Sequence, residues 1–95
     1  MSNVKLYPVK EQAAARTKIN AQRYQEMYEA STNDAEAFWG EQGKRIEWMK
    51  PYSKVKDVSF ASEDLHINWY EDGILNASAN CLDRHLSERG DQTAL

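Results

Sequence analysis

The sequence predicts an α+β fold: an N-terminal helical hairpin, a short β-hairpin and a third helix, together forming the incomplete first part of a larger domain. Three observations predict it, namely two successive stretches with helical periodicity, an Asp-Gly pair between two short apolar runs, and a third periodic stretch before Gly90. A chain of 95 residues has room for one small domain or part of a larger one. We divide it into an arm, residues 1–19, and a folded region, residues 20–95.

Composition favours a folded protein and disfavours polyanionic partners. Hydrophobic residues make up 41% of the chain and charged residues 28%, and three tryptophans and five tyrosines argue against wholesale disorder. The net charge is -3, with acidic and basic residues interspersed. Binding to nucleic acid or to an anionic membrane would require a clustered basic excess, so we expect neither partner.

Cysteine usage and hydropathy indicate a cytoplasmic protein. Cys81 is the only cysteine, which excludes an internal disulfide and a CxxC motif. The N-terminus has no apolar signal-peptide region, and no apolar run approaches the ~18 residues that a membrane span requires. We therefore expect a soluble protein in a reducing compartment.

The first helix of the hairpin is predicted from Asn20. Before it, residues 11–18 allow one or two helical turns through three successive alanines, but the arm shows no clean period. Asn20 is a good N-cap, and one helical stripe follows it. The stripe consists of Ala21, Tyr24, Met27, Tyr28 and Ser31.

The second helix is predicted to begin within residues 31–34, where Asn33 and Glu36 have the spacing of a capping box. Internal glycines cost about 1 kcal/mol each relative to alanine, so we expect a bend or break near Gly43. Pro51 closes the segment. The apolar stripe of this helix consists of Ala35, Phe38, Trp39 and Gln42, and Ile46 and Met49 continue it.

The β-hairpin is predicted around Asp72 and Gly73, because Asp-Gly between two apolar runs is a hairpin turn signal. Its strands are residues 67–70 and 74–75. The preceding residues 52–65 are polar, and we expect an irregular loop there.

The third helix is predicted to begin after the N-cap Asn76 and to end at a left-handed C-cap, Gly90. Its apolar face consists of Ser78, Cys81, Leu82, His85 and Leu86. The final residues, 91–95, read as the approach to a β-strand, so we expect a larger sheet that continues past residue 95.

Cys81 and His85 are the strongest candidates for chemistry. Their i, i+4 spacing suits a Cys/His nucleophile pair or half of a zinc site. Zinc would need two further ligands, however, and the other histidine, His66, lies on a different segment. Since both residues share a face with Leu82 and Leu86, core packing is the favoured interpretation.

No other pattern predicts a catalytic, cofactor-binding or metal-binding residue. Neither GxxxxGK[ST] nor GxGxxG occurs, so no phosphate-binding loop is predicted. The carboxylates of Asp34, Glu36, Glu71 and Asp72 lie at turns and helix starts, which capping explains. The tryptophans are better explained as core or interface anchors than as a ligand box.

Four segments of the chain stand out as motifs: INAQRYQEMYEAS (19–31), FWGEQGKRIEWMKPYSKVKDVSF (38–60), WYEDGILN (69–76) and NCLDRHL (80–86). In this order they resemble the N-terminal region of bacterial acetyl-CoA synthetases. Propionyl-CoA and acetoacetyl-CoA synthetases share the FW pair and the helix outline, but they resemble this sequence less at WYEDG and CLDRHL.

The resemblance implies a ligase of the adenylate-forming superfamily, which uses Mg-ATP to form acetyl-AMP and then transfers the acetyl group to CoA. The catalytic motifs of that family match no position here, so no catalytic residue is carried over and the chain alone is expected to be inactive. Residues 20–95 would be the N-terminal region, truncated before the α/β adenylation core, which it would brace. The expected partner is the remainder of the synthetase chain, and self-association through exposed apolar surface is a further expectation. The rival hypothesis is a stand-alone interaction module that binds a partner protein through exposed aromatics.

Overall fold

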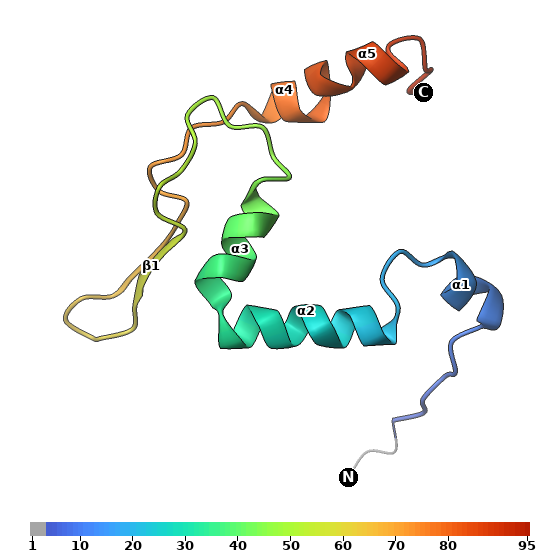
Figure 1. Cartoon of the computed structure of the whole chain (residues 1–95), viewed down its shortest axis with the longest axis horizontal. Coiled ribbons are helices and arrows are strands. Elements are labelled where there is room, and N and C mark those ends of the chain that lie inside the picture. Colours follow the sequence, from blue (N-terminus) through green and yellow to red (C-terminus); the bar gives the residue numbers. More distant parts are fainter. Residues whose placement is uncertain (1–3) are drawn as a thin grey trace. The chain divides into compact units, whose positions relative to one another are not determined.

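The computed structural model describes residues 4–95, and it confirms an α+β fold (Figure 1). The chain divides into two compact units, the first extending to Asn33 and the second comprising Asp34–Leu95. The elements in chain order are α1 (Glu11–Arg16), α2 (Ala21–Asn33), α3 (Ala35–Gly43), β1 (Lys56–Ser59), β2 (His66–Trp69), α4 (Ala77–Cys81), the 3-10 turn η1 (Asp83–His85) and α5 (Leu86–Arg89).

The described part of the first unit consists of residues 4–10, which form no helix or strand, followed by α1 and α2. Residues 1–3 of the predicted arm lie outside the described residues. The predicted cap of α2 is confirmed, because the Asn20 Oδ1 accepts a hydrogen bond from the backbone N–H of Arg23 at 2.8 Å. On the predicted stripe, the rings of Tyr24 and Tyr28 stack with their centroids 6.2 Å apart. Both tyrosines remain more than half exposed, so the unit itself does not cover this stripe.

The second unit begins with α3, and Asp34 caps it in place of the predicted Asn33. The Asp34 Oδ1 accepts from the backbone N–H of Ala37 at 3.2 Å. The expected break near Gly43 is confirmed, since α3 ends at that residue. That α2 and α3 pack as a helical hairpin stays a prediction, because they belong to separate units.

The β-hairpin exists, but its predicted strand pairing is wrong. β2 is a strand as expected, yet it pairs antiparallel with β1, with Lys56 opposite Trp69 and Ser59 opposite His66. β1 lies in the stretch that we expected to be irregular. Its sequence, Lys-Asp-Val-Ser, has one apolar residue and therefore shows no alternation that would reveal a strand.

The Asp72-Gly73 pair forms a turn that leads away from the β-hairpin. The Gly73 N–H donates to the carbonyl of Tyr70 at 2.9 Å. Ile74 then forms an isolated antiparallel bridge with Lys50, whose N–H and carbonyl both bond to it at 3.0 to 3.1 Å. The second apolar run therefore pairs with the segment after α3 and not with β2.

The third predicted helix is broken into α4, η1 and α5. Its cap is confirmed, because the Asn76 Oδ1 accepts from the Ala79 N–H at 2.9 Å. Leu82, with φ -122° and ψ -66°, interrupts the helix. The expected left-handed cap at Gly90 is wrong, since its φ is -58° and its N–H donates to the carbonyl of Leu86 as in a continuing helix.

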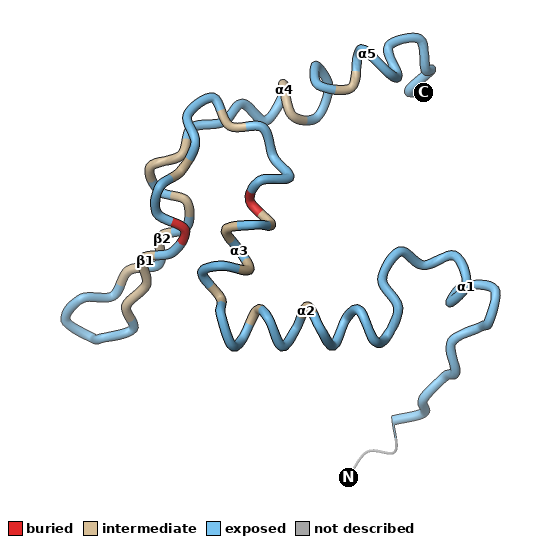
Figure 2. The backbone as a smooth tube through the Cα atoms, viewed as in Figure 1, coloured by how far each residue is buried: buried red, intermediate tan, exposed pale blue. Residues whose placement is uncertain are grey.

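Few of the described residues are buried, as Figure 2 shows. Among their hydrophobic residues only Val55 is buried, at 9% exposed, and Gly43 is buried in the same unit. Core packing of Cys81 was predicted, but the structure places Cys81 in an exposed position. The reason is that this face is mostly uncovered: Leu82 and Leu86 are about two-thirds exposed, although His85 is half-buried.

Candidate functional site: an aromatic and polar junction

Five aromatic residues form a cluster that joins α3, the segment after it and the end of β2. Trp48, Tyr52 and Tyr70 lie at its centre, with ring centroids 4.7 to 5.6 Å apart in tilted or edge-on geometry. Trp39 contacts Trp69 edge-on, with centroids 6.2 Å apart. Such aromatic pairs stabilise a contact beyond simple area burial. We call these five residues the aromatic cluster.

The polar tips of the cluster bind the C-terminal half of α3. The Trp48 Nε1–H donates to the carbonyl of Gly43 at 2.8 Å, and the Tyr52 hydroxyl donates to the carbonyl of Gly40. Both carbonyls belong to the last turn of the helix, where backbone acceptors lack intrahelical partners. The Tyr70 hydroxyl donates to the carbonyl of Trp39 at 2.6 Å. The cluster therefore caps α3 with aromatic side chains.

Two glycines permit the close approach of the aromatic rings. A Cβ added at Gly73 would lie 2.6 Å from the Trp48 ring, and one added at Gly43 would lie 2.6 Å from the Tyr52 hydroxyl oxygen. Both distances are shorter than van der Waals contact allows. Glycine at these positions is thus required by packing against the aromatic cluster.

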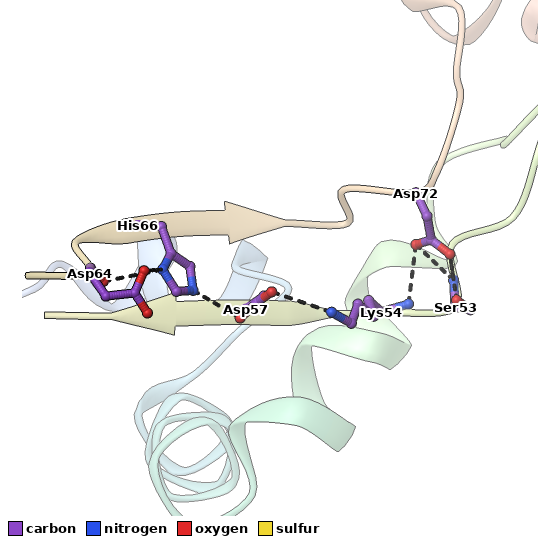
Figure 3. A network of polar contacts seen from close by, with 6 residues as sticks. All are labelled: Ser53, Lys54, Asp57, Asp64, His66 and Asp72. Atoms are coloured by element: carbon purple, nitrogen blue, oxygen red, sulfur yellow. Dashed lines mark hydrogen bonds and ion pairs between the residues drawn. The ribbon is translucent and has the colours of Figure 1, made fainter. Parts of the chain in front are cut away.

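Asp72 joins the turn after β2 to the segment before β1. Its carboxylate accepts hydrogen bonds from the backbone N–H groups of Ser53 and Lys54, at 2.9 to 3.2 Å, and from the Ser53 hydroxyl (Figure 3). These bonds, led by that of the hydroxyl, lower the pKa of Asp72 from 3.8 to about 2. The carboxylate is therefore a structural acceptor, but it binds residues distant in sequence, whereas the sequence interpretation had explained Asp72 by its own turn.

Asn80 and Arg84 attach the C-terminal helices to the segment after α3. The Asn80 side chain accepts from the N–H of Glu47 at 2.8 Å and donates to the carbonyl of Glu47 at 2.9 Å. Arg84 donates to the carbonyl of Arg45 and to the Asn80 Oδ1, both at 3.0 Å. Sequence reasoning missed these roles. The available signal was an asparagine inside a helix, where its side chain competes with the backbone unless it has another partner.

His66 lies between two carboxylates at the tip of the β-hairpin (Figure 3). Its Nε2 is 3.0 Å from the Asp57 Oδ1, and its Nδ1 is 3.2 Å from the Asp64 Oδ1. The bond with Asp57 is the main cause of a raised pKa at His66, and the same bond lowers the pKa of Asp57. The sequence interpretation had considered His66 only as a possible partner for Cys81 and His85.

The structure brings Cys81 and His85 to one open groove of about 380 Å³, and His66 does not line it. A second groove, of about 580 Å³, lies beside the aromatic cluster and is lined by Ile46, Trp48 and Tyr52 among others. Over residues 4–95, no group of three or more His, Cys, Asp or Glu side chains is placed to hold a metal ion. Over the same residues, no helix combines the length and apolar character needed to cross a membrane.

The aromatic cluster and the hydrogen bonds of Asp72, Asn80 and Arg84 together form what we call the junction. The fold and this junction define an α+β segment that has little core. Residues 24–81, which run from α2 to the end of α4, match the family model described as "Acetyl-coenzyme A synthetase N-terminus". The chain belongs to this family.

Curated relatives match the chain over its full length. It is 54% identical to an acetyl-coenzyme A synthetase of Marinobacter nauticus, 55% identical to one of Aeromonas salmonicida and 53% identical to one of Escherichia coli K12. In each case the match covers all of this chain and 15% of the relative. The chain thus spans about one-seventh of the length of the enzymes that it resembles.

Proposed function

We propose that this chain is the N-terminal bracing segment of an acetyl-CoA synthetase, an enzyme that makes acetyl-CoA from acetate, ATP and CoA through acetyl-AMP. Residues 20–95 would contact the large domain, and residues 1–19 would form an arm. On this proposal Mg-ATP and CoA are substrates of the parent enzyme, and no residue of this chain contacts them. The cytoplasm is the proposed location.

The observation that carries the proposal is the amount of apolar surface left uncovered. Tyr24, Tyr28, Leu82 and Leu86 are each more than half exposed, and Val55 is the one buried hydrophobic residue among residues 4–95. A chain with so little buried surface gains stability when a partner covers its apolar faces. The identity to synthetases over the full chain supports the rest of such an enzyme as this partner.

A hybrid enzyme tests the proposal. The segment of the Escherichia coli K12 synthetase that matches this chain is replaced by the chain itself. Acetyl-CoA formation is then measured from acetate, ATP and CoA. We expect the hybrid to be active, and the same enzyme without the segment to be soluble but inactive.

A second hybrid, carrying the matching segment of the Aeromonas salmonicida synthetase, is the matched control for the exchange. The bracing proposal is wrong if that control is active but the hybrid with this chain is as inactive as the enzyme that lacks the segment. The isolated chain should also show no saturable ATP binding in calorimetry, because it has no phosphate-binding loop.

The exposed stack of Tyr24 and Tyr28 favours a second candidate function, a stand-alone module that binds a partner protein through its aromatic surface. This candidate requires that the chain fold without the rest of a synthetase. A monomeric, cooperatively melting chain that ignores the remainder of the enzyme would support it.

A further inference from the structure

The histidine at the tip of the β-hairpin has acceptors on both sides of its ring. Nε2 faces the Asp57 Oδ1 at 3.0 Å, and Nδ1 faces both the carboxylate and the backbone carbonyl of Asp64 at 3.2 Å. Asp57 belongs to β1, whereas Asp64 belongs to the loop, residues 60–65, that connects the two strands. His66 therefore links the loop to the strand.

The charge of the ring decides whether both links can exist. Imidazolium carries a proton on each nitrogen and donates to both sides, whereas neutral imidazole carries a single proton. In the neutral ring one nitrogen would present a lone pair to a carboxylate oxygen, and the two acceptors would repel each other. Deprotonation must therefore break one of the two links.

We infer that His66 is a protonation-dependent clasp: the imidazolium holds the 60–65 loop to β1, and the neutral ring keeps Asp57 and releases Asp64. Three features select Asp64 as the link that is lost. Its contacts are the longer ones, and its carboxylate is 72% exposed against 40% for Asp57. In addition, Lys54 holds the second oxygen of Asp57 at 3.3 Å and keeps that carboxylate in place.

The charges around the ring favour its protonated form, and with it the closed clasp. Its hydrogen bond with Asp57, followed by that with Asp64, raises the pKa of His66 above the ordinary 6.5, although burial acts in the opposite direction. Ser59, the cross-strand partner of His66, carries no charge. The loop also carries Phe60 and Leu65, which are 78% and 67% exposed. Opening the clasp would thus change how two apolar side chains are presented at the hairpin tip.

Nitrogen NMR of the His66 ring in the full 95-residue chain tests the clasp. We expect His66 to titrate at a higher pH than it does in concentrated urea. After deprotonation Nδ1 should take the shift of an unprotonated nitrogen, whereas Nε2 should keep its proton. Asp64→Asn should lower the His66 pKa, and Glu63→Gln is the matched control because Glu63 bonds to Ser62 and lies next to Asp64 in the same loop.

Hydrogen exchange of the 60–65 amides gives the second readout. In the wild-type chain their protection should fall as His66 loses its proton, beyond the ordinary effect of pH on exchange. In Asp64→Asn the side-chain amide can donate to the neutral Nδ1, so the pH dependence should disappear. The clasp is ruled out if His66 titrates as it does in urea, if the neutral ring is protonated on Nδ1, or if both variants shift its pKa equally.

Discussion

At the scale of single residues, the aromatic cluster determines which small residues the chain tolerates. Gly73 looked like a turn residue in the sequence, and it does lie in a turn. Its φ is not positive, however, and the ring of Trp48 leaves no space for a Cβ there. Gly40, by contrast, has the Val55 Cγ2 at an ordinary contact distance of 3.4 Å from an added Cβ.

We predict opposite effects of alanine at these two glycines. Gly73→Ala should lower the local stability of the junction by about 1 to 3 kcal/mol, because overpacking displaces Trp48. Gly40→Ala, within α3, should leave stability unchanged or raise it by up to about 1 kcal/mol through helix propensity. Hydrogen exchange of the peptide around Ile74, measured in the hybrid synthetase, reports the change in local stability in each variant. Equal effects of the two variants would contradict the packing account.

A pH titration should reveal the Asp72 clamp, by which we mean the hydrogen bonds that its carboxylate accepts from Ser53 and Lys54. A carboxyl whose pKa is lowered by folding contributes stability above its unfolded pKa, 3.8, and loses it as the pH falls through the folded value, about 2. The backbone amide shifts of Ser53 and Lys54 should therefore titrate with a midpoint near 2. Asp72→Asn should remove this titration, and Glu71→Gln, on the adjacent residue, should leave it. A midpoint near 3.8 would show that the clamp is absent.

At the scale of elements, the sequence predicted the local features and missed the pairing. Caps at Asn20 and Asn76 were predictable because the acceptor and its donor lie three residues apart. The pairing of β1 with β2 depends on contacts across a loop, and the Asp-Gly signal indicated a different partner. The break at Leu82 was also missed, since the helical periodicity continues through it.

Asn80 provides a test of how α4 is held. Asn80→Ala should free the backbone N–H and carbonyl of Glu47 and weaken the attachment of α4 by about 1 to 3 kcal/mol, because two hydrogen bonds of about 0.5 to 1.5 kcal/mol each are lost. Ser78→Ala in the same helix is the control, because both variants gain the helix propensity of alanine. Hydrogen exchange at the Glu47 amide is the measurement. Equal exchange in the two variants would show that the Asn80 bonds do not hold the helix.

At the scale of the whole molecule, the chain has well-defined local order and little core. The structure describes two units, and within residues 4–95 Val55 is the one buried hydrophobic residue, whereas the aromatic cluster is half-buried. Short helices with uncovered apolar stripes are marginal in water, as is a two-stranded hairpin. The sequence allowed the family to be predicted from its motifs. Interpreting the chain as the incomplete first part of a larger domain also predicted uncovered apolar surface, although its composition is that of an ordinary globular protein.

The most direct test of the bracing account compares the chain alone with the chain mixed with a synthetase from which this segment has been deleted. Alone, the chain should show a broad thermal transition and weak amide protection. In the mixture, the two should form a complex in which the amides of α2, α4 and the junction become protected from exchange. A monomeric chain that melts sharply alone and gains no protection from the rest of the enzyme would contradict the account.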